Sequence, residues 1–215
     1  MRFEEAVRRL ERLPEVLPEG PEALMPVFAA TGSPRLAFGW EADERSARPA
    51  AVLILLFPDE LGEARLLLTE RADRGGHHSG EVSFPGGRVE PGDLDLVATA
   101  LREASEEVGL DLVAAGVRVL GTLPVQWIPV SNFTVTPVLA VAERRPVMTP
   151  RDSEVAAILD APVGAFLPGA ELLLVEREIR GVEIRYAAYP IDGLAVWGMT
   201  ARVLGGLGAW LARED

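Results

Sequence analysis

Three glutamates between residues 94 and 110 have the side chains and the spacing for metal chemistry. Glu103, Glu106 and Glu107 stand three and four residues apart in the stretch LDLVATALREASEEVGL, so a helix would project their carboxylates from roughly one side. Like charges at this spacing repel each other in water. A divalent cation reverses that interaction, because carboxylate oxygens are the ligands that Mg²⁺ and Mn²⁺ prefer. The spacing predicts a Mg²⁺ or Mn²⁺ site.

The residues around the glutamates indicate how they are held. Five apolar residues recur at helical spacing: Val97, Ala100, Leu101, Ala104 and Val108. They predict an amphipathic helix with one buried side. Upstream, FPGG at residues 84–87 indicates a loop whose paired glycines allow a close approach of the backbone. Gly109 follows the helix at the position where a left-handed residue is expected. The plainer alternative is a solvated acidic helix that binds no metal, since charged residues usually face water.

The stretch from Gly87 to Leu110 resembles the Nudix box, G-x5-E-x7-R-E-U-x-E-E-x-G-U, where U is a bulky aliphatic residue. Its second half is present as REASEEVGL, with alanine at the first U. In the first half Asp93 replaces the glutamate, and one extra residue precedes Arg102. The resemblance implies an α/β (α+β) fold in which a mixed β-sheet is sandwiched between helices. It also implies hydrolysis of a nucleoside diphosphate derivative by metal-activated water.

The same resemblance implies a set of metal ligands. Glu103 and Glu107, one helical turn apart, are the first candidates, Glu106 is the third, and the carbonyl of Gly86 is a further one. Hard oxygen donors of this kind suit Mg²⁺ or Mn²⁺.

The candidate catalytic residues are Glu107, Glu106 and Arg102. Arg102 is expected to orient a glutamate through charge-assisted hydrogen bonds. Glu107 is the candidate within the box for the base that activates water, and Glu154, on a later loop, is the alternative. A carboxylate that merely favours a helix start is the plainer interpretation of Glu154.

A second motif indicates a substrate. LLTERA at residues 67–72, followed by GEVSFPGG at residues 80–87, resembles the signature of the coenzyme A diphosphatase branch, LLTxR[SA]x3Rx3Gx3FPGG. The extra residue before Arg102 and the run WGMTA at residues 197–201 are also similar to that branch. The resemblance implies cleavage of coenzyme A into 4′-phosphopantetheine and adenosine 3′,5′-bisphosphate.

One position departs from this signature, because Gly76 stands where a second arginine is expected. Arg74 is the candidate replacement, and Arg71, Arg74 and His78 are the candidate substrate-binding residues. A surface ion pair is the plainer interpretation of Arg71. Gly76 keeps open a Nudix hydrolase of ADP-ribose, NADH or a related dinucleotide. A Nudix module that binds ligand without catalysis is the alternative from another class.

Composition limits the partners. The chain has 215 residues, 48% of them hydrophobic, and a net charge of −12, which argues against nucleic acid as the main partner because phosphate contacts need basic patches. It has no cysteine, so thiolate chemistry is excluded. No long apolar run and no signal peptide are evident, which predicts a cytoplasmic protein without membrane contact. The expected partner is a small nucleotide of the coenzyme A type, and a homodimer is possible.

The spacing of apolar residues and turn signals predicts the order of elements. Residues 1–34 are expected to form an N-terminal helix (3–13) and a Pro/Gly-rich connection packed on the core, with further helix around 22–30. Residues 35–215 are expected to form a single Nudix domain, with the box at about 87–110. It would contain strands at 50–57, 65–70, 81–84, 117–123 and 134–141, a short helix at 154–159, a hairpin at 172–189 and a closing helix at 199–211.

Overall fold

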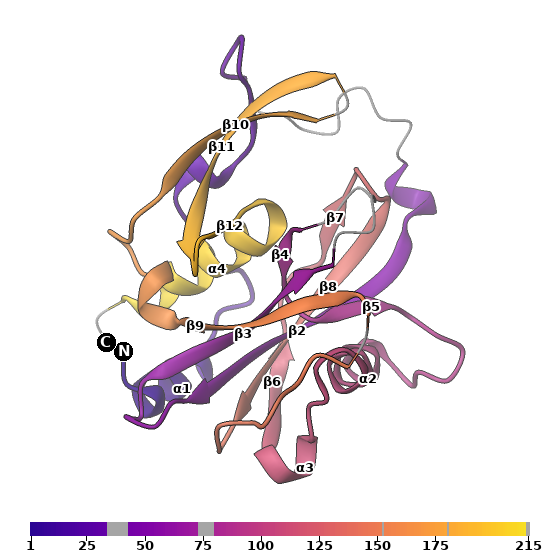
Figure 1. Ribbon diagram of the computed structural model, residues 1–215, viewed down its shortest axis with the longest axis vertical. Helices are drawn as coiled ribbons and strands as arrows, with labels where there is room; N and C mark the ends of the chain where they lie inside the picture. Colours follow the sequence, from indigo (N-terminus) through magenta and orange to yellow (C-terminus); the bar gives the residue numbers. More distant parts are fainter. Residues whose placement is uncertain (34–42, 73–79, 152, 180, 214–215) are drawn as a thin grey trace.

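The computed structural model describes residues 1–33, 43–72, 80–151, 153–179 and 181–213 (Figure 1). Its main element is an eight-stranded mixed sheet with the order β4-β3-β2-β8-β6, in which β5 pairs with β2, β7 with β8 and β9 with β3. The strands are β2 Arg48–Pro58, β3 Ala64–Arg71, β4 Val82–Ser83, β5 Gly86–Arg88, β6 Val117–Thr122, β7 Gln126–Ile128, β8 Phe133–Ala142 and β9 Val155–Pro162.

Strand β2 is the centre of this sheet, as its apolar sequence predicts. It pairs in parallel with β8 along residues 48–56 and antiparallel with β5 at residues 50–52. Strand β3 joins β2 only near the turn, at residues 56–58. Because successive side chains point to opposite faces, Leu53 and Leu55 pack in one apolar cluster and Ile54 and Leu56 in another. The strand is therefore buried on both faces.

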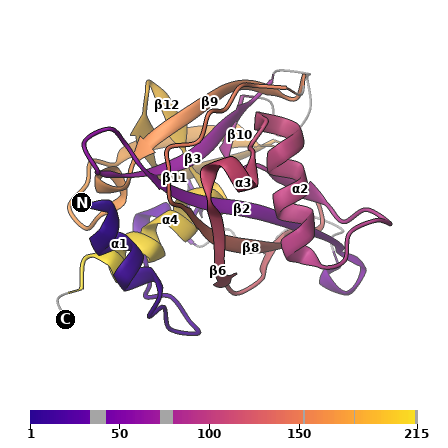
Figure 2. The same ribbon diagram turned by 90° about the horizontal axis from the view of Figure 1, so that it is seen from below.

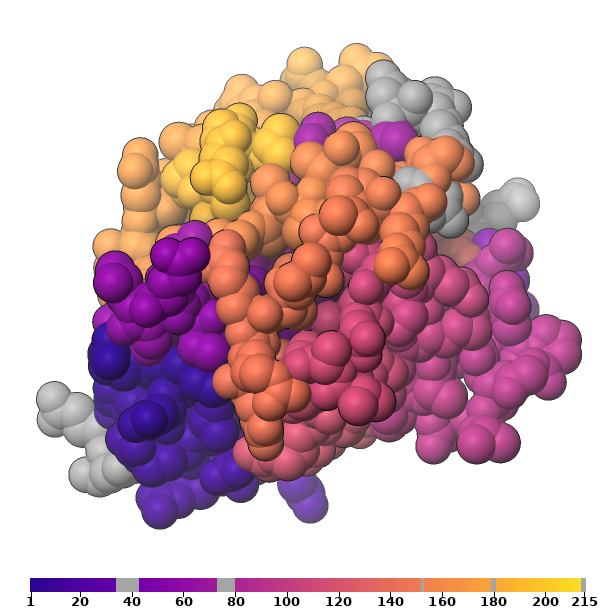
Figure 3. Space-filling view, turned by 60° about the horizontal axis from the view of Figure 1, so that its bottom comes forward, coloured from indigo at the N-terminus to yellow at the C-terminus, as the bar shows by residue number. Residues whose placement is uncertain are grey.

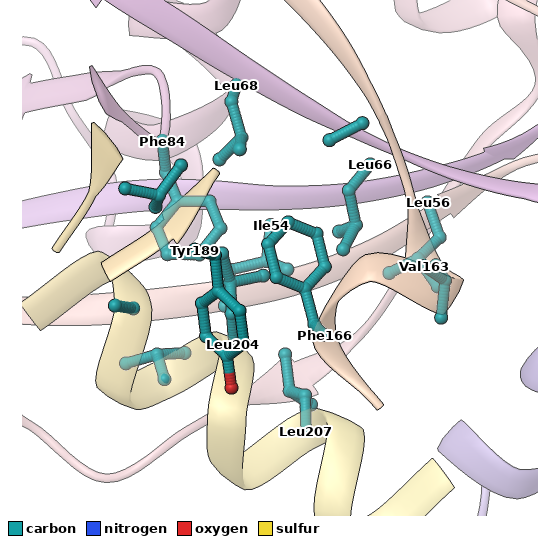
Figure 4. Close-up of a cluster of buried hydrophobic side chains, with 14 of the residues drawn as sticks. Ile54, Leu56, Leu66, Leu68, Phe84, Val163, Phe166, Tyr189, Leu204 and Leu207 are labelled. Atoms are coloured by element: carbon teal, nitrogen blue, oxygen red, sulfur yellow. The ribbon is translucent and has the colours of Figure 1, made fainter. Parts of the chain in front are cut away.

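Helices cover each face of the main sheet. Helices α2 (Leu96–Val108) and α3 (Leu112–Ala115) pack on the Leu53 face. Helices α1 (Phe3–Leu10) and α4 (Gly198–Leu211), with the 3-10 turn η3 (Val163–Phe166), pack on the Ile54 face. Figure 2 shows α1 and α4 on one side and α2 on the other. Figure 4 shows Phe166 and Tyr189 between the strands and α4; their rings meet edge to face at 5.1 Å. The expected mixed sheet sandwiched between helices is confirmed.

A smaller antiparallel sheet lies beyond α4 in Figure 1. It has the order β1-β11-β10, and β12 also pairs with β11. Its strands are β1 Val27–Phe28, β10 Leu173–Ile179, β11 Val182–Ile191 and β12 Leu194–Val196. Gly181 has a φ of 76° at the turn between β10 and β11, a conformation that glycine adopts without steric cost. The predicted hairpin at residues 172–189 is confirmed.

Two predicted elements are wrong. The expected helix at 154–159 is strand β9, because its backbone pairs with β3 from Arg65 to Arg71 and this pairing overrides local helix preference. Around residues 22–30 only the 3-10 turn η1 (Glu22–Leu24) is helical, and Val27–Phe28 joins β11 instead. A second 3-10 turn, η2, spans Glu44–Ser46. The predicted boundary at 34/35 lies outside the described residues. Within the described part of the chain, no helix is long and apolar enough to cross a membrane.

Candidate functional site

Helix α2 positions the three glutamates, as the sequence predicts. It begins where the side chain of Asp95 accepts a hydrogen bond from the backbone amide of Ala98 at 2.8 Å, and an N-cap of this kind satisfies a free amide of the first turn. It ends at Gly109, whose φ is 66°. Ala104 and Val108 are fully buried against the sheet. This packing fixes the rotation of the helix, so Glu103 and Glu107 turn toward β5.

The glycine pair at the start of β5 has two different roles. A side chain at Gly86, whose φ is 153°, would overlap the carbonyl of Ala51 on the neighbouring strand. A side chain at Gly87 would overlap the carboxylate of Glu103. In addition, the backbone amide of Gly86 donates a hydrogen bond to Oε2 of Glu107 at 3.0 Å. Glu107 therefore lies against Gly86 and Glu103 against Gly87, and at Gly87 only glycine leaves room for the carboxylate.

Glu107 is the most buried of the three glutamates, with a relative exposure of 6%. Burial raises the pKa of Glu107 to about 7, although the Gly86 amide and the charge of Arg71 act in the opposite direction. Burial also raises the pKa of Glu103, against the charge and hydrogen bond of Arg102. A low-dielectric environment disfavours the charged form of a carboxyl group. The two carboxylates thus sit where an added positive charge would be strongly favoured.

Arg102 connects helix α2 to the segment that precedes it. Its guanidinium donates to both carboxylate oxygens of Asp93, at 2.8 and 3.0 Å, and to the carbonyl of Arg88 at 3.1 Å. Asp93 also accepts bonds from Thr99 Oγ1 and from the backbone amide of Glu90. These bonds hold the pKa of Asp93 far below its usual range, with the Arg102 bond as the largest cause. Both carboxylate oxygens of Asp93, which replaces the glutamate of the box, therefore accept hydrogen bonds.

Arg102 also contacts two of the glutamates. It donates to Glu103 at 3.2 Å and to Glu106 at 2.9 Å. The side chain of Glu106 is 56% exposed, against 17% for Glu103. Glu106 thus turns toward Arg102 and solvent, whereas Glu103 turns toward the glycine pair.

Arg71 lies at the end of β3 and faces the same site. Its guanidinium pairs with Glu154 at 3.4 Å, and its charge lowers the pKa of Glu107 while that of Glu154 raises it. The backbone amide of Ala72 donates to the carbonyl of Glu154 at 2.7 Å. The two candidate bases, Glu107 and Glu154, are therefore both near Arg71. Arg74, Gly76 and His78 lie outside the described residues.

Sequence reasoning missed the role of the loop between β8 and β9. The amide of Thr149 donates to the carbonyl of Val108, and the amide of Arg151 donates to the carbonyl of Glu107, both at 2.9 Å. The guanidinium of Arg151 lies where a side chain of Gly109 would be. This loop fastens the carboxyl end of α2; Figure 3 shows the segment in orange beside the pink helices. No spacing in the sequence signals these backbone contacts.

The donor chemistry of the site fits a divalent cation, but the three glutamates do not converge. Among the described residues, no group of three Asp, Glu or His side chains is placed to hold a metal ion. Glu103 and Glu107 offer hard oxygen donors beside the glycine pair, which suits Mg²⁺ or Mn²⁺. Glu106 would have to leave Arg102 to join them. The predicted ligand set of Glu103, Glu106, Glu107 and Gly86 stays a prediction.

Comparison with known proteins identifies the family. The model of the NUDIX domain matches residues 47–158. Nudix hydrolase 15, mitochondrial, of Arabidopsis thaliana is 36% identical over 170 residues, which cover 76% of this chain and 59% of that protein. An uncharacterised Nudix hydrolase of Yersinia pestis is 35% identical over 158 residues, covering 73% of this chain and 76% of the relative.

A solved structure is also similar. A Nudix hydrolase from M. smegmatis is 27% identical, with a TM-score of 0.48, and the match covers 60% of this chain and 81% of that one. The chain spans between half and three fifths of the length of the Arabidopsis relatives that it matches. With the box, the sandwich fold and the matched domain model in agreement, the chain belongs to the Nudix family.

Proposed function

We propose that this protein hydrolyses the diphosphate of coenzyme A or one of its derivatives, with Mg²⁺ or Mn²⁺ as cofactor. The observation that supports hydrolysis best is the position of the Glu103 and Glu107 carboxylates, which lie together against Gly86 and Gly87. Partly buried like charges repel each other, and a divalent cation bound between them would relieve this repulsion. A purely solvated acidic helix would leave these side chains in water.

In the proposed site, Glu103 and Glu107 would hold the cation, with Glu106 and the carbonyl of Gly86 completing the set. A bound cation would supply charge neutralisation for the diphosphate and a lower pKa for the attacking water. Arg102, fixed by Asp93, keeps Glu103 in place before the cation arrives. Such residues behind the ligands commonly set metal affinity.

The chain supplies two candidate bases for the water. Glu107 is buried and fixed by the Gly86 amide, whereas Glu154 is half exposed and paired with Arg71. A phosphate that binds Arg71 would compete with Glu154 for the guanidinium. In the overall reaction one bridging P–O bond breaks, the water oxygen joins one phosphorus, and the water protons leave to the base and to solvent.

Coenzyme A is proposed from sequence, because LLTERA, GEVSFPGG and WGMTA are together similar to the coenzyme A diphosphatase branch. Gly76 in place of the second arginine favours a second candidate, a Nudix hydrolase of ADP-ribose or NADH. Both candidates use the same metal-binding residues. The two candidate substrates differ only in the groups that are attached to the diphosphate.

The test is a panel of coenzyme A, acetyl-coenzyme A, oxidised coenzyme A, ADP-ribose and NADH with Mg²⁺ or Mn²⁺, run in ¹⁸O water. We expect 4′-phosphopantetheine and adenosine 3′,5′-bisphosphate, with the label on one phosphate that identifies the attacked phosphorus. Turnover of ADP-ribose far above coenzyme A would replace the first substrate with the second. No turnover of any substrate, with saturable Mn²⁺ binding intact, would favour a ligand-binding module.

A further inference from the structure

Two arginines on one face of the main sheet have no carboxylate partner among the described residues. Arg48, at the start of β2, and Arg88, at the end of β5, are both exposed. By contrast, Arg71 and Arg102 are occupied by Glu154 and Asp93. In a chain with a net charge of −12, guanidinium groups that lack a carboxylate partner among the described residues and share a sheet with a candidate phosphate site are candidates for binding an anionic ligand.

The strand register places these arginines on the same face. Gly86 lies opposite Val52, and Arg88 lies opposite Ala50. Because side chains alternate along a strand, Val52, Ala50 and Arg48 point to one side, away from α2. Arg48 is four residues from Val52, or about 13 Å at ~3.3 Å per residue. That span suits a nucleoside joined to a diphosphate held near Gly86.

An aromatic ring accompanies Arg48. Phe133 pairs with Arg48 across β2 and β8, and the guanidinium carbon of Arg48 lies 4.2 Å from the centroid of the Phe133 ring. The guanidinium also donates to the carbonyl of Ser131 at 3.4 Å. When one face of a guanidinium lies on an aromatic ring, a purine can stack on the opposite face of the guanidinium. The N–H groups in the plane of the guanidinium can then donate to a phosphate.

The turn before Phe133 is braced, which keeps this pair in place. Asn132 has a φ of 50°, an uncommon conformation for a residue other than glycine. Its side chain accepts a bond from Nε1 of Trp127 at 3.2 Å and donates to the hydroxyl of Ser46 at 3.3 Å. Rigid aromatic and guanidinium groups lose little conformational entropy on binding a ligand.

We infer that Arg48 and Phe133 form the subsite for the 3′-phosphorylated adenosine end of the substrate, an assignment that rests on the proposed function. Phe133 supports the guanidinium, the guanidinium stacks the purine, and its free N–H groups meet the 3′-phosphate. Arg88 lies between this subsite and the glycine pair. Arg48 and Phe133 therefore determine specificity and take no part in bond cleavage.

The test compares Arg48→Gln and Phe133→Leu with Arg118→Gln, which removes a surface arginine near the other end of β8, where it pairs with Glu11. We expect the KM for coenzyme A to rise about tenfold in the first two variants, with kcat changed less than about twofold. The preference for coenzyme A over dephospho-coenzyme A should fall in Arg48→Gln. Arg118→Gln should leave KM, kcat and the preference for coenzyme A unchanged.

Calorimetric binding of adenosine 3′,5′-bisphosphate gives a second readout that needs no turnover. We expect its affinity to fall about tenfold in Arg48→Gln and in Phe133→Leu, with circular dichroism and melting temperature confirming the fold. Unchanged KM and unchanged bisphosphate affinity in both variants would overturn the subsite. If the wild type does not cleave coenzyme A but adenosine 3′,5′-bisphosphate still binds through Arg48 and Phe133, the proposed substrate is overturned and the subsite stands.

Discussion

At the scale of single residues, burial gives the three glutamates of α2 different environments. Glu107 is buried and bonded to the Gly86 amide, whereas Glu106 faces solvent beside Arg102. We expect Glu107→Gln to lower kcat by at least about 100-fold, because a neutral amide binds a divalent cation more weakly than a carboxylate does and cannot accept the proton. Glu106→Gln is the matched comparison and should cost less. Activity assays with circular dichroism check both, and full activity in Glu107→Gln would move the base to Glu154.

Substitution of Gly87 tests whether Glu103 is a metal ligand, because the substitution should affect metal binding more than stability. The nearest atoms to a methyl group at Gly87 belong to the carboxylate end of Glu103, whereas the nearest atoms to one at Gly86 belong to the backbone of β2. A flexible side chain can move aside, so Gly87→Ala should change the melting temperature little. The displaced Glu103 should lower Mn²⁺ affinity about 10–100-fold.

The control for this prediction is Gly92→Ala, because a side chain at Gly92 meets nothing within 4 Å. It should leave both Mn²⁺ affinity and melting temperature unchanged. If Gly87→Ala binds Mn²⁺ as tightly as the wild type, Glu103 is not a ligand in the position that it occupies.

Asp93 makes stability depend on pH in a defined direction. Its pKa is lowered in the folded state, chiefly by Arg102, so its contribution is fully present above its unfolded pKa of about 3.9. The contribution is lost as pH falls through that value and below. We expect the stability difference between the wild type and Asp93→Asn to be constant from pH 8 to pH 5. It should shrink between pH 4 and pH 3.

Urea unfolding at each pH measures this difference. The comparison variant is Asp95→Asn, because asparagine caps a helix about as well as aspartate, and it should show little change at pH 7. A difference for Asp93→Asn that stays constant down to pH 3 would mean that the Arg102 bond does not distinguish folded from unfolded protein.

At the scale of elements, the sequence predicts best where pattern and packing agree. The helix expected within residues 94–110 is α2, Leu96–Val108, and the apolar run at 50–57 is the central strand β2. Both carry a clear period and flanking turn signals. The segment 154–159 has residues that favour either structure locally, and only its pairing with β3 makes it a strand. Side-chain contacts such as Thr99 with Asp93 join residues in ways that spacing alone does not specify.

The interior of helix α4 contains three glycines, Gly205, Gly206 and Gly208, that the sequence pattern does not explain. A side chain at Gly208 would overlap the carbonyl of Phe166, and one at Gly205 would meet Leu24 at 2.9 Å. The helix therefore packs closely against η3 and η1. Alanine normally favours a helix over glycine by about 1 kcal/mol, but a backbone carbonyl cannot rotate away as a side chain can.

We therefore expect Gly208→Ala to destabilise the fold by about 1–3 kcal/mol, the usual cost of overpacking. Gly164→Ala, in η3 with open space around it, is the control and should be close to neutral. Denaturant unfolding measures both. A stabilised Gly208→Ala would show that helix preference outweighs the contact with Phe166.

At the scale of the whole molecule, the main sheet lies between the candidate metal-binding glutamates on one face and a large apolar layer on the other. The glutamates and Arg102 lie on the α2 side, whereas α1, η3 and α4 pack on the opposite face (Figure 2). The metal-binding glutamates then depend on the layer of α1, η3 and α4 only through the position of the strands. A change in the far layer should lower the stability of the protein without altering the geometry around Gly86 and Gly87.

Leu10 tests this separation, because it is 2% exposed and lies in the layer formed by α1 and α4. Leu10→Ala should cost about 2–4 kcal/mol through the cavity that it leaves, while Mn²⁺ affinity and kcat, measured well below the melting temperature, stay within about twofold of the wild type. Val16→Ala, at a position 73% exposed, is the matched comparison and should change neither quantity. If Leu10→Ala weakens Mn²⁺ binding at temperatures where the protein is fully folded, the two faces are coupled through the strands, and the site must be described as a property of both layers.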